Sequence, residues 1–408
     1  MMKQVDIAII GGGAAGFFAA ITAAEANPSL RLVIFERGRD VLEKVRISGG
    51  GRCNVTHACY DPTELINFYP RGKKELLGPF MRFAPGDTIE WFTQRGVRLK
   101  TEEDGRMFPV TDQSGTIVHC LLEAAARAGV KVMTQSRVEH LSPPKSEGAS
   151  WRLTVNGQAV MAHKVMLASG SSTGVWKMLA SMGVAIIDAV PSLFTFNIKD
   201  ARIQGLLGIS VPDASVTVGD SDLAAYGPLL ITHWGFSGPA ILKLSAWGAR
   251  ELATRNYQFT ITINWTGSVP EAVLTWMSGQ RINAPKKTVV NSSWPTIPAR
   301  LWQRLLEKTG IPTNRTWTEL RKEEEQALYL ELTASTFRVN GKSTFKEEFV
   351  TAGGIDLKEI DFRRFAVRSL PGLYAAGEVL NIDAITGGFN FQAAWTGGWL
   401  AGKAMAGE

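Results

Sequence analysis

The N-terminal segment constrains the fold of this chain more than any other feature. Residues 5–10 form an apolar run, and the glycines of a G-x-G-x-x-G pattern follow at Gly11, Gly13 and Gly16. In a β-α-β unit the first glycine permits a tight turn, the second lets a pyrophosphate approach the backbone, and the third allows the helix to pack closely on the strand. The pattern therefore predicts a dinucleotide-binding, Rossmann-like unit.

The next residues complete this unit. A helix is expected over residues 14–26, and it ends there because Pro28 cannot continue it. A second strand is expected over residues 30–35. The strand ends at Glu36, about 20 residues after Gly16, where a carboxylate can accept hydrogen bonds from ribose hydroxyls. The same carboxylate would repel a 2′-phosphate, which argues against NADP. The alternative is a glycine-rich turn followed by a solvated Glu36.

Two further glycine-rich segments favour FAD over NAD. Glycines 49–51 lie between Lys44 and Arg52, so that backbone amides and cations can meet phosphate or flavin oxygens. Near the other end of the chain, Gly377-Glu378 precedes the run T-G-G-F-N-F-Q at residues 386–392. A helix beginning near Asn390 would direct its positive end toward the flavin N1/C2-carbonyl edge, while Glu378 would take a ribityl hydroxyl. The alternatives are a mobile surface loop and a simple glycine cap.

These segments resemble those of a known family. Residues 44–54 resemble the K-x-x-x-S-G-G-G-R-C-N signature of the BaiN/RdsA-like flavoproteins, residues 377–392 resemble its G-E…G-G-(Y/F)-N-F-Q run, and residues 230–239 resemble its F-T-H-x-G-x-S-G-P element. The resemblance implies an FAD-dependent oxidoreductase. The family includes a ribosomal RNA dihydrouridine synthase, a flavoprotein linked to bile-acid reduction, and amine oxidases of the aminoacetone type.

The expected fold class is α/β, with a split Rossmann-like FAD-binding domain and an inserted β-rich and helical domain. We expect residues 1–189 and 345–408 to form the FAD-binding domain. The insertion, residues 190–344, divides into a β unit over about 190–266 and a helical unit over about 267–344. In the first domain, residues 151–163 predict a hairpin that turns at Asn156-Gly157. No second G-x-G-x-x-G unit is present, so a dedicated NAD(P)H domain is not expected.

The predicted cofactor-binding residues come from several segments that lie far apart in the chain. Val138 is included because residues 136–141 resemble the strand edge that contacts adenine in flavoproteins of this architecture, where the Val138 backbone would offer the contact. Residues 168–170 stand where the family has A-T-G-G, and the loop after them is shorter than in the family, which affects the expected shape of the substrate pocket. The full set is Gly11, Gly13, Ala14, Ala15, Gly16, Glu36, Arg37, Lys44, Ser48, Gly49, Gly51, Arg52, Cys53, Asn54, Val138, Ala168, Ser169, Gly170, Gly377, Glu378, Gly388, Phe389, Asn390 and Phe391.

Three residues are candidates for catalysis, since the flavin itself performs hydride transfer. His233 can act as an acid or base or contact the substrate, although a lone histidine is often structural. Cys53 can donate a proton, or it can be a buried thiol packed against FAD. Arg106 can bind an anionic substrate, or it can belong to a surface turn. Phe391 and Trp395 either line the flavin or pack in the core.

Composition excludes several classes of protein. The 408 residues contain no apolar run long enough to span a membrane, and the N-terminus enters a strand without a leader sequence. The three cysteines, Cys53, Cys59 and Cys120, lack the spacing of a metal site, so no metal is expected. Reduced thiols and the missing leader favour a cytoplasmic location.

The net charge of the chain and its groups of basic residues indicate what kind of substrate it can bind. The net charge of +6 and the pI near 9.2 favour a polyanionic partner. Basic residues group at Arg71/Lys73/Lys74, Lys286/Lys287, Arg321/Lys322 and Arg363/Arg364, although each group is also typical of an ordinary solvated surface.

The preferred hypothesis is therefore a flavin reductase that converts uridine to dihydrouridine in 23S ribosomal RNA, with NAD(P)H as a transient electron donor. A small-molecule amine oxidase or enoyl-type reductase, and an FAD-bound binding protein without turnover, remain open. The oligomeric state is also left open.

Overall fold

The computed structural model describes residues 4–146, 148–343 and 350–408, and it divides into two compact units. The first unit contains Met1–Val190 and Lys346–Glu408, and the second contains Pro191–Phe345. Each unit has its own cluster of buried apolar side chains.

A parallel sheet forms the centre of the first unit. Its strands lie in the order β21 (Leu373–Ala375), β9 (Gln158–Leu167), β1 (Gln4–Ile10), β2 (Leu32–Phe35) and β6 (Lys131–Met133). All four adjacent pairs are parallel. β2 is buried along its whole length, as expected for a strand that is covered on both faces. The predicted α/β class with a Rossmann-like domain is confirmed.

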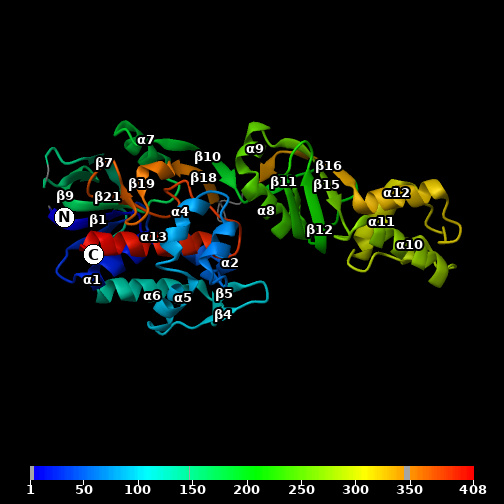
Figure 1. The fold of residues 1–408 in the computed structure, drawn as a ribbon, viewed down its shortest axis with the longest axis horizontal. Helices are drawn as coiled ribbons and strands as arrows, with labels where there is room; N and C mark the ends of the chain where they lie inside the picture. The colour runs from blue at the N-terminus through cyan, green and yellow to red at the C-terminus, as the bar shows by residue number, and fades with distance from the viewer. Residues whose placement is uncertain (1–3, 147, 344–349) are drawn as a thin grey trace. The chain divides into compact units, whose positions relative to one another are not determined.

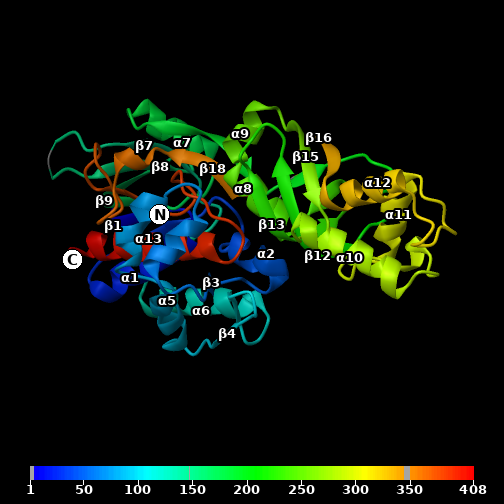
Figure 2. The same ribbon diagram turned by 45° about the vertical axis from the view of Figure 1, so that its right-hand side comes forward.

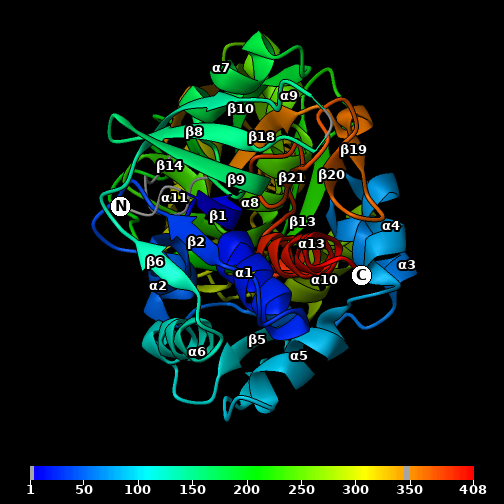
Figure 3. The same cartoon turned by 90° about the vertical axis from the view of Figure 1, so that its left-hand side faces the viewer.

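Two helices from opposite ends of the chain lie side by side against this sheet (Figure 3). They are α1 (Ala14–Ala26) and α13 (Phe389–Ala406). A Cβ atom at Gly398 would lie 2.7 Å from the Ala15 carbonyl oxygen, and one at Gly402 would lie 2.7 Å from the Ala19 carbonyl oxygen. Glycine is therefore required at these positions of α13 because the two backbones approach so closely.

The remaining elements of the first unit include four strands that extend this sheet by antiparallel pairing, together with the other helices and smaller groups of strands. They are α2 (Glu43–Gly51), β3 (Thr56–His57), α3 (Pro62–Leu65), η1 (Ile66–Phe68), α4 (Lys73–Phe80), α5 (Pro85–Thr93), β4 (Leu99–Thr101), β5 (Arg106–Pro109), α6 (Ser114–Arg127), β7 (Val138–Ser142), β8 (Trp151–Val155), α7 (Thr173–Ser181), β10 (Ile186–Ser192), β18 (Val350–Ile355), η3 (Leu357–Glu359), β19 (Ile360–Asp361) and β20 (Ala366–Val367). β8 and β9 form the predicted hairpin, with Asn156-Gly157 at its turn.

The second unit combines an antiparallel sheet with helices (Figures 1 and 2). The strand order is β16 (Ser335–Asn340), β15 (Gln258–Asn264), β12 (Ser210–Val218), β13 (Ala224–Ile231), β14 (Gly235–Ser237), β11 (Thr195–Asn197) and β17 (Lys342–Ser343). The helices are α8 (Pro239–Trp247), α9 (Ala249–Thr254), α10 (Pro270–Asn283), η2 (Val289–Asn291), α11 (Ala299–Thr309) and α12 (Lys322–Thr333). Alternate residues of β15 are buried, which is the pattern of a sheet with one covered face.

The start of α12 at Lys322 is set by local hydrogen bonds. Glu319 accepts hydrogen bonds from the amide and hydroxyl of Thr316, which forms a separate turn. The Glu324 carboxylate then accepts from the Arg321 amide at 2.8 Å, which caps the helix at this start.

No helix in the described parts of the chain is long and apolar enough to cross a membrane. Within the same residues there is no cluster of three or more His, Cys, Asp or Glu side chains suited to holding a metal ion.

Candidate functional site: a cradle at the strand ends

The glycines after β1 have different surroundings. A Cβ at Gly11 would overlap the Ala168 carbonyl oxygen, and one at Gly16 would overlap the Gly11 carbonyl oxygen. A Cβ at Gly13 would find no atom nearer than 4.0 Å. Gly13 is the N-cap residue of α1, and no side chain caps the amide groups there. Gly11 and Gly16 are thus needed for packing, whereas the space beside Gly13 and the positive end of α1 can accept an anion.

Glu36 is held at the end of β2 by two backbone amides. Its Oε2 accepts from Gly12 at 2.8 Å, and its Oε1 accepts from Gly38 at 2.7 Å. The Glu36 backbone also bonds to Met133 and Ser136, which brings the segment leading to Val138 alongside. Arg37, in contrast, is exposed. The carboxylate is therefore fixed in place, with lone pairs left to accept a hydroxyl.

The glycine-rich segment after Lys44 contains a break in α2. Ser48 has an extended backbone, and Gly49, Gly50 and Gly51 have φ values of 59°, 66° and 83°. A Cβ at Gly50 or Gly51 would meet nothing within 4 Å, so the backbone there is uncovered. The glycine-rich loop ends at Cys53, whose amide donates to the Ser48 carbonyl at 3.0 Å.

An ion pair joins the two ends of the chain at this place. Lys44 Nζ donates to Glu378 Oε2, although the two residues are 334 positions apart. The other carboxylate oxygen, Glu378 Oε1, is buried without a hydrogen-bond partner, and the Ser169 hydroxyl is in the same state. A Cβ at Gly170 would lie 3.6 Å from Glu378 Oε2, and one at Gly377 would lie 3.2 Å from the Ala15 Cβ.

Buried polar groups without partners are rare in folded proteins, and each calls for a ligand or water. Ser169 and Glu378 therefore point to a hydroxyl-bearing ligand beside the α1 N-terminus. Together with the open position beside Gly13 and the anchored Glu36, these two side chains form what we call the cradle. Its groups fit the diphosphate, ribose and ribityl parts of FAD.

The side chains at the start of α13 have partners within the protein. The Asn390 side chain accepts from the Ala384 amide at 3.0 Å and donates to the Ala384 carbonyl at 3.1 Å. The Phe389 ring is buried against Phe68 and His57, at centroid distances of 4.3 and 4.6 Å. These contacts fix the loop before the helix. The Gly388 and Phe391 positions remain at its N-terminal end, where Phe391 stacks on Trp395 at 5.6 Å.

Trp395 belongs to the core rather than to a ligand surface. It is fully buried, and its Nε1 donates to the Val55 carbonyl at 2.9 Å.

Arg52 and Arg106 share an acidic partner. Arg52 donates to Glu102 at 2.6 Å and lies 3.9 Å above the Phe108 ring. Arg106 pairs with Glu102 at 3.1 Å and with Asp104 at 2.6 Å. The structure thus directs both cations to carboxylates of the same β4–β5 region, and their charge is already matched there.

Cys53 is fully buried, and burial raises the pKa of its thiol to about 12. It therefore stays protonated at neutral pH and cannot act as a thiolate nucleophile. His233, the remaining catalytic candidate, is exposed in a turn of the second unit.

Sequence reasoning missed one prominent interaction near the C-terminal motif. Arg71 donates two hydrogen bonds to the carboxylate of Asp383, whose side chain is fully buried. In addition, the Tyr69 hydroxyl donates to the Phe389 carbonyl at 2.6 Å. Arg71 had been grouped only with surface lysines. No local pattern could reveal a partner 312 residues away.

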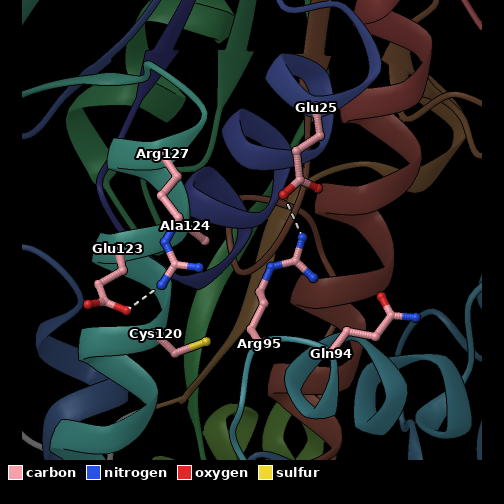
Figure 4. A pocket seen from close by; sticks show the side chains of 7 residues that line it. All are labelled: Glu25, Gln94, Arg95, Cys120, Glu123, Ala124 and Arg127. Atoms are coloured by element: carbon pink, nitrogen blue, oxygen red, sulfur yellow. Dashed lines mark hydrogen bonds and ion pairs between the residues drawn. The ribbon is translucent and has the colours of Figure 1, made fainter.

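A separate cavity of about 310 Å³ lies among α1, α5 and α6 (Figure 4). It is lined by Glu25, Gln94, Arg95, Cys120, Glu123, Ala124 and Arg127. Its arginines are paired with its glutamates, Arg95 with Glu25 and Arg127 with Glu123. None of the predicted site residues lines it, so it is distinct from the cradle.

The similarity to known proteins extends over nearly the whole chain. Residues 5–404 match the model of the HI0933-like protein Rossmann domain. The chain is 30% identical to the ribosomal RNA dihydrouridine synthase of Escherichia coli (strain K12), over 98% of both chains. It is 28% identical to the 3-dehydro-bile acid delta(4,6)-reductase of Clostridium scindens, also over 98% of both chains.

A solved structure has the same fold. The 3-ketosteroid-delta4-(5alpha)-dehydrogenase of Rhodococcus jostii RHA1 matches with a TM-score of 0.54 at 15% identity, over 99% of this chain and 97% of that chain.

Proposed function

This chain belongs to the HI0933-like Rossmann family, and we propose that it uses FAD to reduce the C5=C6 bond of a uridine in 23S ribosomal RNA. The predicted BaiN/RdsA-like family and the predicted class, an FAD-dependent oxidoreductase, are confirmed. The substrate is our proposal, together with NAD(P)H as the transient electron donor and the cytoplasm as the location. We also propose that residues 1–189 and 345–408 form the FAD-binding domain, with 190–344 as the insertion.

The observation that carries the cofactor assignment is the Lys44–Glu378 ion pair beside two unpartnered buried oxygens. It brings the N-terminal and C-terminal motifs to one place, which is what a single long cofactor requires. When bound, the flavin would supply hydride transfer.

The residues of the chain then have separate roles. The amides at the start of α1 hold the diphosphate in the open space at Gly13, and Glu36 accepts the adenosine ribose hydroxyls. Ser169 and Glu378 bind the ribityl hydroxyls, with Lys44 keeping the Glu378 carboxylate in position. The positive end of α13 favours negative charge nearby.

The substrate proposal rests on the relatives. The relative at 30% identity is named for dihydrouridine synthesis in ribosomal RNA, and the relative at 28% for reduction of a bile acid. Both names describe saturation of a carbon–carbon double bond. The net charge of +6 favours the polyanionic substrate of the two.

Mass mapping of large-subunit ribosomal RNA from a deletion strain tests this proposal. We expect one dihydrouridine to be lost and then restored by the wild-type gene but not by a Gly13→Val variant. Unchanged modification in the deletion strain would reject the RNA substrate.

The bile-acid relative supports the second candidate, a small-molecule reductase. The purified enzyme would then consume NAD(P)H with an enone or dienone and leave RNA unmodified. Peroxide release with amines would indicate an oxidase instead. A flavin reduced by neither NAD(P)H nor substrate would indicate a binding protein.

A further inference from the structure

The turn at residues 232–234 of the second unit is held rigidly from within. It connects β13 to β14, which pair with Ile231 opposite Phe236. The Thr232 amide donates to the Gly235 carbonyl at 2.8 Å, and the Thr232 hydroxyl donates to the same oxygen at 3.1 Å. That hydroxyl also accepts from the Trp234 amide at 3.3 Å. The side chain of Thr232 thus closes the turn.

The neighbouring strand holds the turn from outside. The Ile198 amide donates to the Trp234 carbonyl at 2.7 Å. Gly235 has a φ of 142°, and a Cβ there would overlap the Phe196 carbonyl oxygen. These contacts therefore restrain the backbone of the turn.

This rigid turn presents an indole ring to solvent. Trp234 is 55% exposed, and the adjacent His233 is also exposed. Many of the other tryptophans are fully buried, among them Trp151, Trp265 and Trp395. A tryptophan offers more apolar area than most side chains, so leaving it uncovered costs burial free energy that a partner can recover.

A positively charged residue follows Ile198, the residue that pairs with the backbone of the turn. Lys199 follows Ile198 and is exposed. The nearest acidic residue in sequence, Asp200, is already held by Arg202 through two hydrogen bonds of 2.7 and 2.8 Å. The Lys199 charge is therefore not neutralised by its neighbour.

We propose that the 232–234 turn is an RNA contact, in which a single-stranded or flipped-out base stacks on Trp234 while Lys199 binds a neighbouring phosphate. This inference rests on the proposed function, since it takes ribosomal RNA as the substrate. A planar base matches the exposed indole face, and a phosphate matches the lysine. A protein partner would need a broader apolar surface than one ring on a turn.

Binding of a fluorescein-labelled, uridine-containing single-stranded RNA to the FAD-loaded enzyme tests the proposal. Trp234→Ala is expected to raise Kd about 5- to 150-fold, the range of a lost base–aromatic stack. Trp234→Phe is expected to retain most of the affinity because it keeps a ring. The matched control is Trp247→Ala, since Trp247 is 42% exposed at the end of α8 in the same unit. Its Kd should stay within about twofold of wild type.

Cross-linking of RNA that carries 4-thiouridine locates the contact independently, and we expect the labelled peptide to contain Trp234. The proposal is overturned if Trp234→Ala and Trp247→Ala bind RNA equally well, or if the cross-link maps elsewhere. It is also overturned if the wild-type enzyme does not bind the RNA, or if Trp234→Ala changes only the sedimentation of the protein, which would reveal a protein interface.

Dihydrouridine formation by wild-type enzyme separates the two hypotheses. If wild type modifies RNA while Trp234→Ala binds normally, the turn assignment fails and the function stands. If wild type binds RNA through Trp234 but forms no dihydrouridine, the reaction assignment fails instead.

Discussion

At the residue scale, Gly13 and Gly16 separate ligand binding from folding. A side chain at Gly13 meets only open space, whereas one at Gly16 overlaps the Gly11 carbonyl. We expect Gly13→Val to fold with a melting temperature close to that of FAD-free wild type but to purify colourless, because valine occupies the diphosphate space. Gly16→Val should instead lose the fold. Circular dichroism melts and absorbance near 450 nm distinguish the variants, and a yellow Gly13→Val protein would refute this placement.

Glu378 provides a second single-residue test. Its Oε1 is buried without a partner, so it is expected to accept a ribityl hydroxyl. A hydrogen bond to a charged group contributes about 1.5–3 kcal/mol, so Glu378→Gln should weaken FAD binding about tenfold or more. Lys44→Met is the comparison variant: it removes the 50% exposed partner that positions Glu378 but keeps the carboxylate, so the loss of FAD affinity should be smaller. Titration of each apoprotein with FAD measures the affinity of both variants. A larger loss of affinity in Lys44→Met than in Glu378→Gln would contradict the assignment.

The buried thiol of Cys53 makes a pH-dependent prediction. Burial raises its pKa from 9.0 to about 12, so the unfolded chain loses this proton first as the pH rises. The resulting stability is complete below pH 9 and declines between pH 9 and 12. Wild type should lose about 1.4 kcal/mol per pH unit in this window relative to Cys53→Ala. Urea unfolding at pH 8, 9 and 10 measures the difference, and parallel curves would contradict it.

At the scale of elements, the Arg71–Asp383 pair joins the segment before α4 to the loop before α13. Asp383 is fully buried, so removing Arg71 leaves a carboxylate without its main cation. Arg71→Met is expected to lower the free energy of unfolding by about 3–5 kcal/mol. Arg363→Met is the matched control, because the Arg363 side chain is 83% exposed and an ion pair of an exposed cation contributes little. Denaturant melts would contradict the prediction if both variants behaved alike.

The α1–α13 pair shows how much element packing depends on small residues. Gly398 and Gly402 let α13 approach the α1 backbone at Ala15 and Ala19. The N-termini of both helices belong to motifs that we assign to FAD, so the packing that joins the helices also forms the cradle.

At the scale of the whole molecule, two separate buried cores predict two unfolding transitions. FAD binds only the first unit in our assignment, so excess FAD should raise one transition and leave the other unchanged. At 100 times Kd the expected gain is about 2.7 kcal/mol. Calorimetry with and without added FAD tests this, and equal shifts of both transitions would place the cofactor contacts differently.

Local patterns were sufficient for much of the first unit. The helix after Gly13 has the predicted bounds, Ala14–Ala26, and the predicted hairpin with its turn at Asn156-Gly157 also forms. These features depend on signals within a few residues: apolar runs, glycines with required conformations, and a proline that ends a helix. The family, the α/β class and the oxidoreductase class followed from the same short motifs.

Pairings between distant residues were decided only by the folded chain. Lys44 meets Glu378 because β21 lies beside β9 and brings the C-terminal motif to the start of α1. Arg52 donates to Glu102, and the Asn390 side chain bonds to the Ala384 backbone, and neither partner could be read from the local sequence. A cation or amide bonds to whatever the sheet order places next to it, and that order depends on contacts spread along the whole chain.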